Sequence, residues 1–131
     1  MANRNFSRVQ ALQKEIKIIE GSVVIGATGA VGTVLGLGVD SITRNATGNY
    51  TITLEDAYNR LVGLSTFFSG TTESAVFSVQ VDDATPQASI KSKDIILQCY
   101  DAAGSDVDPA QTVLMHFSLL LRNSSLGQTD E

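Results

Sequence analysis

The chain offers few side chains that could catalyse a reaction or hold a metal ion. His116 and Cys99 are the single histidine and the single cysteine of the 131 residues. A zinc site of the usual kind needs three or four ligands, so one chain cannot build it from His and Cys. Cys99 could act as a nucleophile with His116 as its base on an adjacent strand, but no orienting acid or oxyanion-hole motif accompanies them. We therefore predict a buried structural thiol, no enzymatic activity, and no catalytic or metal-binding residue.

Three acidic residues lie close together near the end of the chain. Asp101, Asp106 and Asp108 fall around Gly104 and offer the oxygen ligands that calcium prefers. Their spacing does not match an EF-hand loop, which ends in a bidentate glutamate. A solvated loop is the preferred interpretation, the sequence leaves cation binding by this loop open, and we expect no cofactor.

A glycine motif follows the first apolar run. Gly26, Gly29 and Gly32 are spaced like the dinucleotide-binding fingerprint, in which glycines let the backbone approach a pyrophosphate at a helix N-terminus. The next segment contains Gly36 and Gly38, and each costs a helix about 1 kcal/mol relative to alanine. The pattern therefore favours a glycine-rich strand and loop with close backbone contacts, and dinucleotide binding is a less favoured alternative.

Composition indicates one globular domain of ordinary kind. Hydrophobic residues make up 43% of the chain and charged residues 18%, and no apolar stretch reaches the ~20 residues of a membrane helix. The net charge is −5: four basic residues oppose two acidic ones through Glu20, and five oppose twelve from Gly21 onward. An acidic body repels phosphate backbones, so neither nucleic acid nor membrane is an expected partner.

Strand patterns occupy most of the chain. The β-branched run 16–25 predicts one or two strands, and two alternating runs around an Asn/Gly turn predict a hairpin over 39–54. Within that hairpin Tyr50, Ile52 and Leu54 share one face. Other segments predict a helical turn or irregular crossover over 55–61 and strands over 64–68, 75–81, 94–100 and 113–122.

Together these elements predict an all-β fold. Seven or eight short strands without a long helix indicate an antiparallel β-sandwich or jelly-roll-like domain over residues 14–122. A short N-terminal arm over 1–13 precedes it, and a polar C-terminal tail over 123–131 follows it.

The chain has more apolar residues on strands than one buried face requires. The run Leu119-Leu120-Leu121 is apolar on both faces of its strand, so either a second subunit or the domain's own loops cover the outer face. The predicted partner or oligomer interface includes residues of the arm, the glycine stretch and an aromatic pair: Arg4, Phe6, Arg8, Val9, Leu12, Val31, Val34, Leu35, Leu37, Phe67 and Phe68.

The hairpin letters SITRN and GNYTITL, together with the closing LLLRNSS, carry a family resemblance. They resemble small structural proteins of tailed bacteriophages, particularly β-sandwich capsid decoration (cement) or head-fibre proteins. The resemblance implies a virion protein that is made in the bacterial host cytoplasm, forms trimers or dimers, and binds the major capsid protein on the outside of the head. There it would stabilise the coat lattice, because a protein that binds only the assembled shell favours assembly. The alternative is a tail-fibre or baseplate domain that binds a host receptor, although the chain lacks tryptophan.

Overall fold

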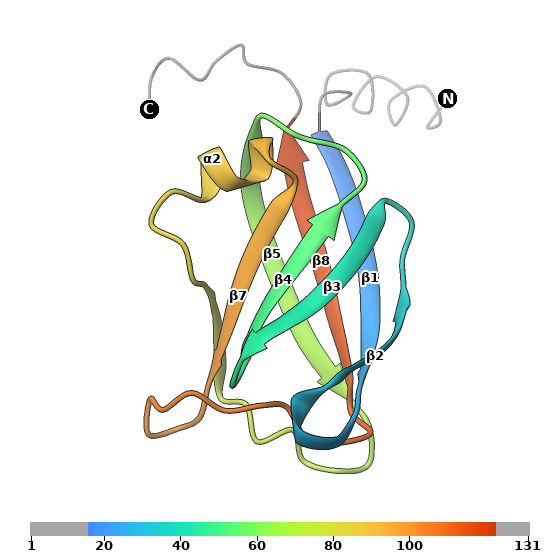
Figure 1. Ribbon diagram of the computed structural model, residues 1–131, viewed down its shortest axis with the longest axis vertical. Helices are drawn as coiled ribbons and strands as arrows, with labels where there is room; N and C mark the ends of the chain where they lie inside the picture. The colour runs from blue at the N-terminus through green and yellow to red at the C-terminus, as the bar shows by residue number, and fades with distance from the viewer. Residues whose placement is uncertain (1–15, 123–131) are drawn as a thin grey trace, which may run out of the picture.

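The computed structural model describes residues 16–122, which form two facing antiparallel sheets (Figure 1). Sheet A has the strand order β2-β1-β8-β5, and sheet B has the order β3-β4-β7-β6. The predicted all-β sandwich is therefore confirmed. The proposed arm over 1–13 and tail over 123–131 lie outside the described residues.

Sheet A contains β1 (Ile16–Ile25), β2 (Val31–Leu35), β5 (Arg60–Ser69) and β8 (Leu114–Arg122). Sheet B contains β3 (Val39–Ala46), β4 (Asn49–Leu54), β6 (Ser78–Val81) and β7 (Asp94–Tyr100). A 3-10 turn, η1 (Ala27–Gly29), joins β1 to β2, and a short helix, α2 (Pro86–Lys91), lies between β6 and β7.

The core fills the space between the two sheets. On β4 the predicted alternation places Tyr50, Ile52 and Leu54 inside, each at most 1% exposed. On β8 the inward residues are Met115, Phe117, Leu119 and Leu121. Because β8 pairs with β1 on one side and β5 on the other, it forms the centre of sheet A.

Helix α2 covers one end of the sandwich and is the main element that the sequence did not predict (Figure 1). Its Ile90 is fully buried, and Pro86 stands at the start, where the missing amide hydrogen costs nothing. The Gln87 side chain accepts a hydrogen bond from the Leu61 amide (2.7 Å) and donates one to the Leu61 carbonyl (3.1 Å). This side chain therefore protects part of the β5 edge as a neighbouring strand would.

Two predicted boundaries were wrong. Of the two alternatives for 55–61, the chain takes the irregular crossover, over 55–59, and β5 already begins at Arg60 rather than at residue 64. The strand predicted from Ala75 begins at Ser78 as β6, and Ala75 has a φ of +67°, which lies outside the extended conformation of a strand.

Candidate functional site

The outer faces of the two sheets differ in chemistry. Sheet B presents a polar surface whose side chains bond to one another. Asn45 donates to Asn49 Oδ1 (2.8 Å) and to Thr51 Oγ1 (2.7 Å), and Asn49 donates to Gln98 Oε1 (2.9 Å). These groups are satisfied within the chain, so the sheet B surface suits contact with water.

The outer face of sheet A combines apolar and polar side chains and carries several exposed large apolar residues. Side chains alternate along a strand, so the residues of β8 between its buried ones point away from the core. The register of β1, β2 and β5 against them gives the composition of this surface. We define the sheet A face by its outward residues: Ile16, Ile18, Glu20, Ser22 and Val24 of β1, Leu35 of β2, Arg60, Gly63, Ser65, Phe67 and Ser69 of β5, and Leu114, His116, Ser118, Leu120 and Arg122 of β8.

Three large apolar side chains of the sheet A face are well exposed. Ile18 and Phe67 are each 62% exposed and Leu35 is 59% exposed. Two shallow hollows, of about 370 and about 320 Å³, lie between these side chains and the small residues around Ser65 and Ser118. Apolar side chains gathered on one surface mark a site for another molecule.

An aromatic pair on β5 and β8 of the sheet A face is held rigidly. The rings of Phe67 and His116 stack with centroids 4.3 Å apart and an interplanar angle of 7°. His116 Nε2 also makes a 2.8 Å hydrogen bond with Ser69 Oγ. Because its ring is stacked and hydrogen-bonded, His116 positions Phe67 as a flat apolar platform on the surface.

The predicted interface residues separate into three groups. Leu35 and Phe67 belong to the sheet A face, and Leu37 is 94% exposed in the connection between β2 and β3. Val31, Val34 and Phe68 are partly buried and pack against the core. The predicted arm residues, Arg4, Phe6, Arg8, Val9 and Leu12, lie outside the described residues.

The hypothesis that Cys99 and His116 lie on adjacent strands was wrong. Cys99 is on β7 of sheet B and is fully buried, whereas His116 is on β8 of sheet A and points outward. Burial, and then the nearby Asp108 charge, raise the pKa of the Cys99 thiol to about 12. The thiol is therefore protonated near neutral pH and cannot act as a nucleophile there.

We expect Cys99 to resist modification while the protein is folded. With Ellman's reagent at pH 8, the native protein should release almost no chromophore, and protein in guanidinium should release one equivalent. The physical reason is that the thiol is buried and protonated. Rapid labelling of the native protein would contradict the buried placement.

The acidic loop is held by its own hydrogen bonds. Asp101 Oδ1 accepts bonds from the amides of Ala103 (2.9 Å) and Ser105 (3.0 Å), as an Asx turn does. The Asp108 carboxylate is bound by Arg44, so Asp101 and Asp108 are bonded to different partners. Within residues 16–122, no group of three His, Cys, Asp or Glu side chains could hold a metal ion.

Gly29 of the glycine motif takes part in a group of hydrogen bonds that joins distant segments of the chain. We call this group the clasp; its residues are Gly29, Arg44, Gly48, Tyr50 and Asp108. Arg44 donates to Asp108 through Nε (3.1 Å) and Nη2 (2.7 Å), and the Gly48 amide donates to the same carboxylate (2.7 Å). Tyr50 donates its hydroxyl hydrogen to the Gly29 carbonyl (2.7 Å). Partial burial opposes ionisation of Asp108, but the bonds from Arg44 and Gly48 outweigh it and lower the pKa of Asp108.

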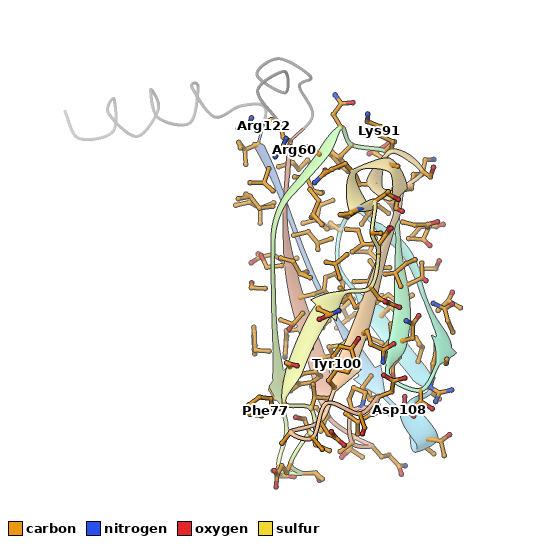
Figure 2. All side chains as sticks on the ribbon, turned by 90° about the vertical axis from the view of Figure 1, so that its left-hand side faces the viewer. Arg60, Phe77, Lys91, Tyr100, Asp108 and Arg122 are labelled. Carbon is orange, nitrogen blue, oxygen red and sulfur yellow. The ribbon has the colours of Figure 1, made fainter. Side chains whose placement is uncertain are left out.

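This clasp argues against dinucleotide binding at the glycines. The segment after Gly32 continues as strand β2, so no helix N-terminus lies there to bind a pyrophosphate. The Asp108 carboxylate lies directly beside Gly29, where its negative charge would repel a phosphate. Figure 2 shows Asp108 at one end of the sandwich, with Arg60 and Arg122 close together at the other.

Comparisons with known proteins give no family for this chain. No protein-family model matches it, and searches of curated proteins and of solved structures give no significant match. In the part of the chain that the structure describes, no helix is both long enough and apolar enough to span a membrane.

Proposed function

We propose that this chain is an accessory structural protein of a tailed-phage particle that attaches to the outside of the head and stabilises the coat lattice. The observation that carries the proposal is the contrast between the two outer faces: Ile18, Leu35 and Phe67 are exposed on the sheet A face, whereas the sheet B face is polar and hydrogen-bonded within itself. A domain with large apolar side chains exposed on one face suits attachment to protein on one side and exposure to water on the other.

The resemblance to decoration proteins supports the phage assignment. Its letters coincide with the β3–β4 hairpin and with the end of β8, which are structural elements rather than loops around a pocket. Ile16 pairs with Arg122, so the two ends of the described chain lie together at one end of sheet A.

The experiment is to find the protein on purified particles of the phage that encodes it. An antibody against the folded domain, seen by immunogold electron microscopy, should label heads evenly. Particles that lack the protein should lose DNA at a lower temperature, since a ligand of the assembled shell stabilises it. Label confined to the tail would favour a receptor-binding fibre or baseplate domain, and unlabelled particles would refute a virion role.

A further inference from the structure

We propose that the sheet A face binds the same face of a second copy of this chain. This inference rests on one part of the proposed function, that the face binds protein, and names a second copy as the partner that covers the face in the free protein. The apolar residues of the face, its area and the order of its side chains point to self-association.

The area of the face is sufficient for a weak dimer. Strand β8 has 9 residues, which at about 3.3 Å per residue span about 30 Å. The four strands at about 4.8 Å spacing cover about 19 Å, and β2 is shorter, so the face measures roughly 500 Å². Two copies would bury about 1,000 Å², which is the lower limit of specific interfaces.

One row of residues across sheet A is self-complementary. Leu35, Ser22, His116 and Phe67 are paired in register from β2 to β5, which places the exposed apolar side chains of Leu35 and Phe67 at the two edges, with Ser22 and His116 between them. A two-fold axis parallel to the strands, between β1 and β8, exchanges β1 with β8 and β2 with β5. Each Leu35 then lies opposite Phe67 of the second copy, in the isologous manner of two-fold dimers.

The same axis brings a second apolar pair together. Ile18 is paired with Leu120 across β1 and β8, so exchanging these strands sets each Ile18 opposite Leu120 of the second copy. Facing sheets lie about 10 Å apart, a gap that such pairs of large side chains fill. The small residues Gly63 and Ser65 leave hollows beside Leu120 that can accept side chains from the facing sheet.

Glu20 opposes this docking. It points outward beside Ser118, near the middle of the face, and a carboxylate loses hydration when a second sheet covers it. The charge therefore keeps the dimer weak. It also provides a test, since Glu20→Gln removes the charge at nearly constant size.

The closing experiment is light scattering after gel filtration over a concentration series of the full chain. The chain should change from one-chain to two-chain mass as concentration rises, and Phe67→Ser should raise the dissociation constant at least about tenfold, because the contact occurs twice. Phe77→Ser is the matched control, since Phe77 is 75% exposed but lies outside the sheet A face. Thermal unfolding of each variant shows whether it is folded.

Glu20→Gln supplies an independent measurement and should lower the dissociation constant several-fold. A one-chain mass at every concentration, or an oligomer that both Phe67→Ser and Glu20→Gln leave unchanged, would overturn the inference. Binding to particles separates it from the proposed function. If the protein dimerises but is never found on particles, self-association is supported and the virion role is refuted. If it is a strict monomer that is found on heads, the virion role is supported and self-association is refuted.

Discussion

Gly29→Ala should destabilise the folded protein by at least about 2 kcal/mol, although it adds one methyl group. Gly29 has a φ of +78°, a conformation in which an L-residue costs about 1–2 kcal/mol. The added methyl group would also overlap the Asp108 carboxylate. Asp108 would have to move, which weakens its hydrogen bonds from Arg44 and Gly48.

Urea unfolding followed by circular dichroism measures this loss, and Gly104→Ala is its control. Gly104 has a similar φ of +86°, but nothing lies within 4 Å of the position where its methyl group would go. The control should therefore lose only the backbone contribution of about 1–2 kcal/mol and should be the less destabilised of the two variants. Combining Gly29→Ala with Asp108→Ala should remove the excess cost, because the two sites are in contact. Equal losses for the two glycine variants would contradict the close approach.

The contact between Gly29 and Asp108 in the clasp could not be predicted from the local sequence. The spacing of Gly26, Gly29 and Gly32 suggested close backbone approach, and the structure shows that approach at Gly29. What approaches is Asp108, for which the sequence predicts a solvated loop and leaves cation binding open. Nothing in the residues around either position encodes their contact, because it arises from the order in which strands pair across the sandwich.

The predictable parts of the fold are those with a local physical cause. The hairpin followed from an Asn/Gly turn between alternating runs, and the prediction for 94–100 coincides with β7. Helix α2 was not predicted because six residues carry too little periodicity, although Thr85-Pro86 is a usual helix start. Its stability comes from burying Ile90, a tertiary contact.

The candidate site was predicted in part for a similar reason. Phe67 and Phe68 are adjacent on β5, so one must face outward and the other toward the core. The sequence could not decide which, because an irregularity between Leu61 and Gly63 resets the alternation of the strand. The sequence therefore indicated that the β8 strand has more apolar residues than one buried face requires. Which residues form the sheet A face follows only from the pairing register of β8 with β1 and β5.

Leu119→Ala and Leu120→Ala should affect different properties of the protein. The first should lower the stability of the fold, and the second should weaken the proposed interface. Leu119 is fully buried at the centre of β8, so its truncation should cost about 3 kcal/mol of unfolding free energy through lost burial and a cavity. Leu120, its neighbour, points outward and is only partly buried. Its truncation should cost less than about 1 kcal/mol in the monomer.

The order of the two effects should reverse in self-association. Light scattering should show that Leu120→Ala raises the dimer dissociation constant about tenfold, since each Leu120 lies opposite Ile18 of the second copy in the proposed dimer. Folded Leu119→Ala should dimerise almost as the parent does, because its side chain lies behind the face. If Leu120→Ala changes neither stability nor association, then the outer leucine has no partner. The apolar excess of β8 would in that case not reflect self-association.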